Sequence, residues 1–242
     1  IVVSSGSNRG YDLALDASDN IYVTGDLDGT ADFDPNAGVV NLTTVGNKDF
    51  YLAKYDAAIN YIWAINMGGA SVYAQAEALA LDASGNAYVA GFFSGGTSLD
   101  FDPTAGTANV TNNGSYDAFV AKYDASGNYV YANGMGGTDA DFAYGVAVDG
   151  SGNAIVTGAF WNTVDFDPSA GTANLTSNGV GDIFVAKYNS TGAYVFAHGM
   201  GSGTDIDRGL SVATDGSGNI YITGWFNGTV DFDPGAGQNE LS

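Results

Sequence analysis

The chain of 242 residues has no cysteine, one histidine and only six lysine or arginine residues. The absence of cysteine excludes disulfide bonds, thiol chemistry and thiolate metal sites. The single histidine, His198, stands where the other repeats described below have Asn66 and Asn133, so we expect a tolerated polar position in a strand. No serine lies in a nucleophile elbow, and the residues therefore give no sign of a catalytic triad.

Basic residues are few, but acidic ones are abundant: 27 in all, 25 of them aspartate, for a net charge of −21. Such a surface repels nucleic acid and anionic membranes, so nucleic-acid binding and membrane association are not expected. It attracts cations, above all Ca²⁺, whose preferred ligands are carboxylate and carbonyl oxygens. No apolar run approaches the length of a membrane span, and no signal peptide is visible.

The chain does not begin with methionine, and it opens within the apolar run IVVSS. We therefore expect these residues to be a piece of a longer protein, whose targeting signals lie elsewhere. The content of 45% hydrophobic and 13% aromatic residues is sufficient for a substantial core.

Internal repetition dominates the sequence. A unit of about 66 residues returns with its phrases in the same order, as expected for an array of similar structural units. The landmarks are Gly25, Gly91, Gly158 and Gly224; the lysines Lys54, Lys122 and Lys187 of "AKY"; and Met67, Met135 and Met200.

One unit, residues 77–135, shows how each repeat is expected to fold. ALALD (78–82) and NAYVAGFF (86–93) are β-strand patterns joined by ASGN, whose glycine and asparagine suit a tight turn. AFVAKYD (118–124) and NYVYANG (128–134) form a second hairpin with the same turn chemistry. Each unit is thus predicted to contain four strands, two hairpins and one long central connection.

A four-stranded sheet of this size, apolar on both faces, must be covered by its neighbours. Radial stacking of such sheets gives an all-β protein, a β-propeller of ~66-residue four-stranded antiparallel blades. A β-helix is the alternative, but its coils are usually shorter and lack paired hairpins. We expect three full blades near 11–67, 77–135 and 144–200 and a partial blade at 209–242. Residues 1–5 would end a preceding blade, so that 1–242 forms one repeat region.

The phrases GVAVDGSGNAIVTGAF and DIFVAKYNSTGAYVFAHGMG resemble the SBBP-type β-propeller repeats of secreted and surface proteins of bacteria, and the first half also resembles NHL blades. The resemblance covers essentially the whole chain. It implies the propeller fold and an extracellular or cell-surface location. It implies no particular activity.

A second phrase, DFDP, occurs once in every unit, on the connection between the second and third strands. In the meander of a blade, this connection and the link to the next blade lie at the same end of the sheet, where binding sites are expected. In an extended Asp-Phe-Asp the two carboxylates point the same way and the phenylalanine points back toward the core. The aspartates concerned are Asp32, Asp34, Asp100, Asp102, Asp165, Asp167, Asp231 and Asp233.

Two interpretations of DFDP stay open. The phenylalanine can plug the blade while the aspartates accept hydrogen bonds from turn amides or pair with the repeat lysine. Alternatively, the carboxylates and nearby carbonyls can hold Ca²⁺, although the spacing does not match an EF-hand loop. Direct contact with a ligand is a third and weaker interpretation.

Trp161 and Trp225 follow the second strand of their units and lie near the same loops, so they are candidates for stacking on sugars, with blade packing as the alternative. Two carboxylates can hydrolyse glycosides, but a catalytic pair should be unique and this one is copied in each unit. A polysaccharide-active enzyme is therefore the least favoured hypothesis.

We expect a non-enzymatic, extracellular or cell-surface β-propeller that acts as an adhesion or binding scaffold, stabilised by calcium. Its partner would be a surface protein or a glycan. The alternative is self-association, with the chain as a structural subunit of a filament, sheath or surface layer whose open strand edges pair between subunits.

Overall fold

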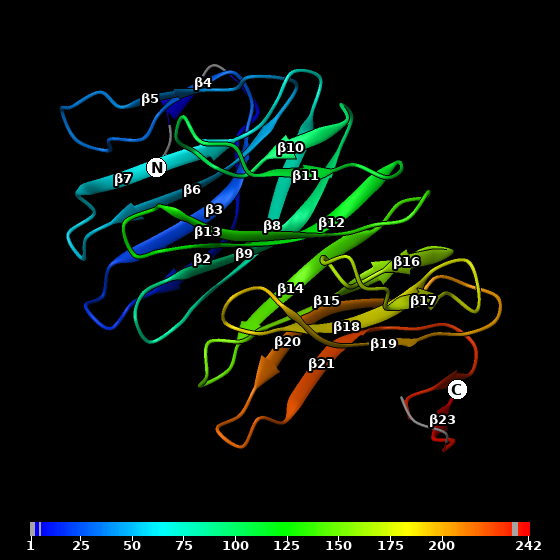
Figure 1. The fold of residues 1–242 in the computed structure, drawn as a ribbon. Coiled ribbons are helices and arrows are strands. Elements are labelled where there is room, and N and C mark those ends of the chain that lie inside the picture. Colours follow the sequence, from blue (N-terminus) through cyan, green and yellow to red (C-terminus); the bar gives the residue numbers. More distant parts are fainter. Residues whose placement is uncertain (1–2, 5, 234–236) are drawn as a thin grey trace.

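The computed structural model describes residues 3–4, 6–233 and 237–242, and the strands of this part of the chain are connected by turns and short loops (Figure 1). Among the described residues, no helix is long and apolar enough to span a bilayer. The main strands group into three four-stranded antiparallel sheets and one two-stranded sheet, numbered here as blades 1 to 4.

Each of the first three blades is a meander in which consecutive long strands are neighbours. Blade 1 contains β2 (Arg9–Leu15), β3 (Ile21–Leu27), β6 (Asp49–Tyr55) and β7 (Tyr61–Met67). Blade 2 contains β8 (Tyr73–Leu81), β9 (Ala87–Ser94), β12 (Tyr116–Tyr123) and β13 (Tyr129–Met135). Blade 3 contains β14 (Phe142–Val148), β15 (Ala154–Phe160), β18 (Asp182–Tyr188) and β19 (Tyr194–Met200). Blade 4 contains β20 (Arg208–Thr214) and β21 (Ile220–Trp225).

The predicted repetition of four-stranded antiparallel sheets is therefore confirmed. The prediction of one plain central connection was incomplete, because this connection folds into a short hairpin of its own, called the DFDP hairpin below. The hairpins are β4–β5 (Thr30–Asp32, Asn41–Thr43), β10–β11 (Ser98–Asp100, Asn109–Thr111), β16–β17 (Thr163–Asp165, Asn174–Thr176) and β22–β23 (Val230–Asp231, Glu240–Leu241). In blades 1 to 3 the second strand of the hairpin contacts the outermost strand of the blade.

The segment 1–5, which was expected to end a preceding blade, is described only at residues 3 and 4. Val3–Ser4 form β1, which pairs with β4 of the first DFDP hairpin. Residues 1, 2 and 5 of that segment lie outside the described residues, as does Pro234 of the fourth DFDP phrase.

The tight turns between strands are held by the residue that precedes them, which is Asn189 between β18 and β19 and an aspartate in the other turns described below. In blade 2, Asp82 Oδ1 accepts the amides of Ser84 and Asn86, and Oδ2 accepts the Asn86 side chain at 2.7 Å. Gly85 has a φ of +77°, the left-handed conformation that glycine adopts without steric cost. The same hydrogen-bond pattern holds the turns that begin at Asp16, Asp56, Asp124, Asp149 and Asp215.

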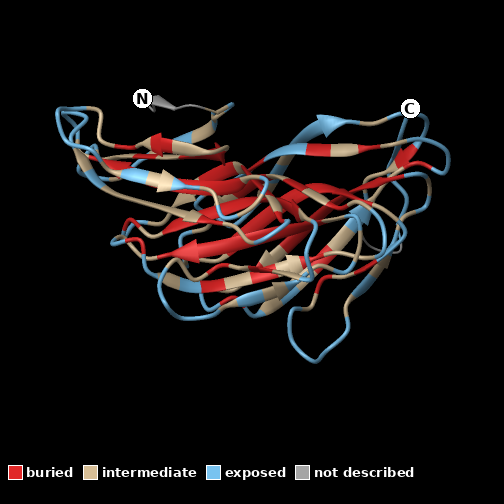
Figure 2. Cartoon of the chain, turned by 90° about the horizontal axis from the view of Figure 1, so that it is seen from above, coloured by how far each residue is buried: buried red, intermediate tan, exposed pale blue. Residues whose placement is uncertain are grey.

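The blades stack in chain order, and their first strands β2, β8, β14 and β20 contact one another in series (Figure 1). Alternate residues of a first strand face the preceding and the following blade. Leu79 of β8 thus joins the core shared with blade 1, whereas Ala78 joins the core shared with blade 3. The buried residues concentrate in the middle strands of the stack, and the loops are exposed (Figure 2).

Within the described residues, no further blade covers either end of the stack. Leu13 of β2 is 61% exposed, although its counterpart Leu79 inside the stack is 6% exposed. At the other end Tyr221 is 57% exposed, while its counterparts Tyr22 and Tyr88 are completely buried. Each of these tyrosines inside the stack donates its hydroxyl to a turn carbonyl of the next blade: Tyr22 to Gly85 at 3.0 Å and Tyr88 to Gly152 at 2.8 Å.

Candidate functional site

The DFDP hairpins and the links between blades lie together at one end of the sheets, called the loop face here, as the meander topology predicts. Gly136 in the link after blade 2 forms a β-bridge with Asp165 in the DFDP hairpin of blade 3. The link also forms a parallel bridge between Ala140 and Tyr116, at the start of β12. The Asp-initiated turns meet one another at the opposite end. The loop face is therefore a continuous surface that crosses several blades.

The first aspartate of each DFDP phrase holds the base of its hairpin. Asp165 Oδ1 accepts the amide of Asp167 at 3.0 Å and the amide of Ala173, across the hairpin, at 2.8 Å. Asp32, Asp100 and Asp231 make the same two hydrogen bonds in their own hairpins. One carboxylate oxygen of each first aspartate is thus committed to backbone amides.

In the first three phrases the second aspartate begins the next turn. Asp34, Asp102 and Asp167 accept the amides of Asn36, Thr104 and Ser169, each at 2.9 Å. The phenylalanines between the two aspartates, Phe33, Phe101 and Phe166, are completely buried. This geometry matches the interpretation in which phenylalanine plugs the blade and the aspartates accept turn amides.

The repeat lysines have different partners from those considered in the sequence. Lys54, Lys122 and Lys187 pair with the turn aspartates Asp16, Asp82 and Asp149, at 3.4, 3.7 and 2.8 Å. Lys54 and Lys122 also lie over the rings of Tyr22 and Tyr88, at 4.6 and 4.7 Å from the ring centroids. These lysines therefore stabilise the turn end of each blade and not the DFDP hairpins.

The described residues contain no group of three or more Asp, Glu, His or Cys side chains placed to hold a metal ion. The two aspartates of one DFDP phrase would thus need carbonyl or water oxygens as further ligands. Calcium binding by Asp32, Asp34, Asp100, Asp102, Asp165, Asp167, Asp231 and Asp233 stays a prediction.

A second set of acidic residues is buried at the loop face. Asp49, Asp117 and Asp182 lie at the first or second position of the third strands and are at most 1% exposed. Each accepts a loop amide through Oδ2, while Oδ1 is buried without a hydrogen-bond partner. The glycine after each repeat methionine leaves room for this carboxylate, because a Cβ on Gly68, Gly136 or Gly201 would collide with it.

Burial shifts the ionisation of these carboxyls. Desolvation raises the pKa of Asp117 to about 6, although amides of Asn113 and Gly114 favour the ionised form. Desolvation also raises the pKa of Asp141, in the following link, to about 7, and the nearby charge of Asp117 adds to the effect. Asp141 accepts the amides of Gly137 and Trp161 at 2.8 and 2.9 Å, so it joins the link to the end of β15.

Aromatic side chains form a continuous row along the loop face of blades 2 and 3. Tyr116 contacts Phe92 at a centroid distance of 5.6 Å and Phe142 at 5.4 Å, so the row crosses from blade 2 to blade 3. Phe142 in turn contacts Trp161 and Tyr144, both at 5.8 Å. We call the set Tyr73, Phe92, Tyr116, Phe142, Tyr144 and Trp161 the aromatic row.

Cations flank the aromatic row at both ends. Lys48 of blade 1 lies 5.6 Å from the ring centroid of Tyr73 and forms an ion pair with Asp26 at 2.7 Å. Arg208 of blade 4 lies 5.7 Å from both the Tyr144 and the Trp225 rings. The row and its flanking cations therefore reach from blade 1 to blade 4.

The two tryptophans predicted from the sequence have different surroundings. Trp161 is half-buried and packs over Gly181, where a Cβ would lie 2.5 Å from the indole ring. Trp225 is 40% exposed and contacts Arg208. Trp161 thus belongs to the packed row, and Trp225 offers the more accessible ring.

Sequence reasoning missed the other members of the row. Phe142 has Gln75 as its counterpart in blade 2 and Arg208 in blade 4, so the row does not follow the repeat. The available signal was the aromatic residues at the ends of the blade links, in VYAQ and DFAYG, and at the end of the DFDP connection, in SYDAF.

A polar cavity of about 350 Å³ lies between blades 2 and 3 and is lined by residues outside the aromatic row. Asp165, Asp167 and Pro168 of one DFDP phrase form one wall, and Asn109, Thr111 and Asn113 of the preceding hairpin region form another. This cavity brings two of the predicted site residues together with amide and hydroxyl groups. The predicted polar site His198 lies elsewhere, half-buried on the outer strand β19 against Phe196.

Comparison with known proteins gives two informative similarities and no matching family model. The chain is 31% identical over 215 residues, 77% of its length, to an uncharacterized WD repeat-containing protein of Acanthamoeba polyphaga mimivirus. It is 27% identical over 128 residues, 51% of its length, to the regulatory protein FlaEY of Caulobacter vibrioides. The chain spans 15% and 13% of the lengths of these relatives. Together with the repeated four-stranded sheets, the first similarity indicates a repeat protein of the β-propeller type.

Proposed function

We propose that the chain is a non-enzymatic binding scaffold whose loop face holds an extracellular glycan. The observation that carries this proposal is the aromatic row, which crosses from blade 2 to blade 3 at the loop face. The polar cavity between the same two blades adds hydrogen-bonding groups. Partly exposed rings stack on the apolar faces of sugars, and aspartate, asparagine and threonine side chains bond their hydroxyl groups. A surface protein is the alternative partner.

The cell-surface location rests on the resemblance of the repeats to SBBP-type propellers, and the adhesive role rests on analogy at the level of the fold. The high negative charge supports a partner that is neutral or cationic rather than a nucleic acid. The name of the mimivirus protein states a repeat type, and that of FlaEY states a regulatory role for that protein. Neither name specifies a ligand for this chain.

The proposed scaffold does not catalyse glycoside hydrolysis through its DFDP carboxylates. The DFDP carboxylates are repeated, and one oxygen of each first aspartate is occupied by two amides, so these groups are organised to shape hairpins. Catalysis of glycoside hydrolysis needs one proton donor and one base or nucleophile in distinct environments. The equivalent environments of the DFDP pairs do not provide that distinction.

A glycan array tests the proposed function directly. The purified chain should bind a restricted set of polysaccharides, and Trp225→Ala should weaken binding roughly 10-fold, as expected for one stacked ring. Tyr221→Ala is the matched control, because it removes an exposed aromatic ring at the turn end of the same strand. Absence of glycan binding together with retention of a surface protein would favour the alternative partner. Equal losses in both variants would contradict the assignment of the loop face.

A structural role in a filament or surface layer is the second candidate function. The exposure of Leu13 at one end of the stack and of Tyr221 at the other favours it, because both are buried positions inside the stack. Sedimentation velocity separates the two functions: a subunit of an assembly should form large species in near-neutral buffer, whereas a scaffold should remain discrete.

A further inference from the structure

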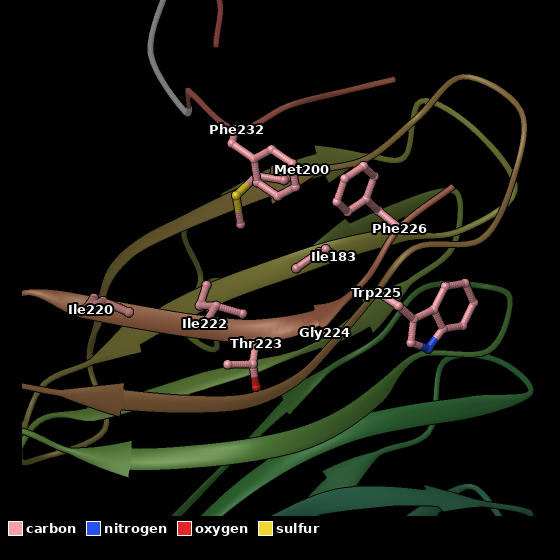
Figure 3. A pocket seen from close by; sticks show the side chains of 9 residues that line it. All are labelled: Ile183, Met200, Ile220, Ile222, Thr223, Gly224, Trp225, Phe226 and Phe232. Atoms are coloured by element: carbon pink, nitrogen blue, oxygen red, sulfur yellow. The ribbon is translucent and has the colours of Figure 1, made fainter. Parts of the chain in front are cut away.

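Blade 4 has an open strand edge with a pocket beside it. Within the described residues, β21 pairs only with β20. The opening next to β21 is a pocket of about 440 Å³ (Figure 3). Ile183 and Met200 of blade 3 form its floor, and Thr223, Gly224 and Phe232 of blade 4 also line it.

The complete blades show what occupies the equivalent place. The third strand of blade 2 sets Phe119 opposite Gly91 of β9, and that of blade 3 sets Phe184 opposite Gly158 of β15. Phe119 then stacks on Phe50 of the preceding blade at 5.0 Å. An aromatic residue opposite the repeat glycine therefore fills the space between neighbouring blades.

The same aromatic residue is also held by its own blade. The DFDP phenylalanine packs against it: Phe101 lies 5.0 Å from Phe119, and Phe166 lies 5.1 Å from Phe184. In blade 3 the hydroxyl of Thr157 donates to the carbonyl of Phe184 at 2.7 Å. A second-strand threonine and a DFDP phenylalanine thus form part of the socket for the third strand.

Blade 4 keeps every part of this socket. Gly224 and Thr223 correspond to Gly158 and Thr157, because Gly209 pairs with Gly224 as Ala143 pairs with Gly158. Phe232 is the fourth DFDP phenylalanine and contacts Phe226 at 5.2 Å. All three lie around the pocket (Figure 3).

At the turn end of blade 4, an aspartate of the described chain also lacks the cationic partner that its counterparts have. In blade 2, Lys122 of the third strand pairs with Asp82 and lies over Tyr88. Blade 4 keeps the counterparts of the last two as Asp215 and Tyr221. Asp215 forms no ion pair with a lysine or arginine of the described chain. A strand with a lysine three residues after its aromatic residue would place the ammonium group there, as the pair Phe184 and Lys187 does in blade 3.

A folded second copy of the chain cannot supply this strand. The strands with the required pattern, β6, β12 and β18, each lie between two neighbours within their own sheet. Their backbone groups are therefore already paired on both edges.

We propose that the edge of β21 is a specific acceptor for a β-strand from a further repeat of this type, with the order aromatic, two residues, lysine, tyrosine. The strand adds antiparallel to β21, its aromatic side chain lies opposite Gly224 on Ile183 and Met200, and its lysine pairs with Asp215. Backbone hydrogen bonds along the edge give the affinity, and the aromatic and lysine positions give the register.

The test uses the intact chain and a labelled synthetic peptide of residues 182–200, which carries the third-strand and fourth-strand pattern. Fluorescence anisotropy should show saturable one-to-one binding, and hydrogen exchange should show slower exchange of amides in 220–225. Phe184→Ala in the peptide should weaken binding at least ~100-fold, the loss expected for a buried phenylalanine. Thr223→Val in the protein should weaken it roughly 5-fold, the loss expected for one hydrogen bond.

Val130→Ala is the control variant, because it removes an exposed apolar side chain on the outer strand of blade 2 and should leave binding unchanged. The proposal is overturned if the peptide does not bind, if Phe184→Ala binds equally well, or if the protected amides lie outside 220–225. Association of the chain with itself that the peptide does not compete would also overturn it.

Discussion

The ring of Phe101 lies 5.0 Å from the ring of Phe119, at an interplanar angle of 62°. Phe101 comes from the DFDP hairpin and Phe119 from the third strand of the same blade. Equivalent contacts join Phe166 to Phe184 and Phe33 to Tyr51, both at 5.1 Å. The DFDP phenylalanine therefore packs its hairpin against the third strand of the blade.

Phe101→Ala should lower the free energy of unfolding by about 3–5 kcal/mol, because it deletes a fully buried ring and leaves a cavity. Urea denaturation monitored by circular dichroism measures the change. Phe232→Ala is the matched control in blade 4, where the corresponding ring is only half-buried, and it should cost clearly less. Equal costs would show that the third-strand aromatic is not what makes the contact stabilising.

Calcium should raise the melting temperature if the DFDP carboxylates bind it. A ligand at 100 times its dissociation constant adds about 2.7 kcal/mol per site when it binds only the folded state. The measurement compares melting in EDTA with melting in millimolar Ca²⁺.

The double variant Asp165→Asn with Asp167→Asn separates the metal role from the hairpin role. The amide oxygen of asparagine can still accept the hydrogen bonds that Asp165 Oδ1 now accepts, so the hairpin should survive while the calcium effect is reduced. An unchanged melt of the original chain in calcium would leave the DFDP aspartates with the hairpin role alone.

The hydroxyl of Tyr88 in blade 2 donates a hydrogen bond to the Gly152 carbonyl in blade 3, and its removal should destabilise the fold. Tyr88→Phe should lower the free energy of unfolding by about 1 kcal/mol, since it leaves a buried carbonyl without this donor. Tyr221→Phe removes the equivalent hydroxyl at the open end, where it bonds only the exposed turn of Asp215, and thermal denaturation should detect almost no change. A similar loss in both variants would argue against a role in joining blades.

The protein should be most stable in acidic solution, near about pH 4. Burial raises the pKa values of Asp117 and Asp141 to about 6 and 7 in the folded state. The folded chain then binds more protons than the unfolded one, so stability decreases as the pH rises from about 4 to 7. Hydrogen bonds from Asn60 and Asn219 lower the pKa values of Asp56 and Asp215, and that stability is lost below about pH 4.

Asp117→Asn tests whether the carboxyl of Asp117 causes the loss of stability as the pH rises toward 7. The variant should show a flatter dependence of the free energy of unfolding on pH between about 5 and 7, because the buried titrating group is removed. Asp19→Asn removes one carboxyl from an exposed turn and keeps the dependence, which controls for the change in net charge. If both variants follow the original curve, the decrease arises from general charge repulsion.

The main sheets of the fold follow from the sequence because their signals are local. Strands of six or more residues with β-branched and aromatic side chains are separated by turns whose aspartate and glycine have defined roles, as at Asp82 and Gly85. The DFDP hairpin escaped prediction because its strands, such as Thr163–Asp165, are three residues long and too short to show alternation.

The candidate site was less predictable than the fold. Trp161 and Trp225 were identified because they follow the second strand of their units, near the DFDP loops. Tyr116 and Phe142, in contrast, come together only when blades 2 and 3 stack. The carboxyl of Asp117 lies beside Gly136, a contact between positions 19 residues apart that depends on the path of the link. Such contacts between non-equivalent positions have no periodic signal.

Tyr22 and Tyr88 each fasten one blade to the next, but the equivalent position in blade 3 is Ile155, which has no hydroxyl to donate. When the stability of a stack is the sum of contacts between neighbouring blades, the interface with the fewest stabilising contacts separates first. Under tension applied to its two ends, the chain should therefore extend in steps. The earliest and lowest-force step should release β20 and β21 while the three complete blades remain folded.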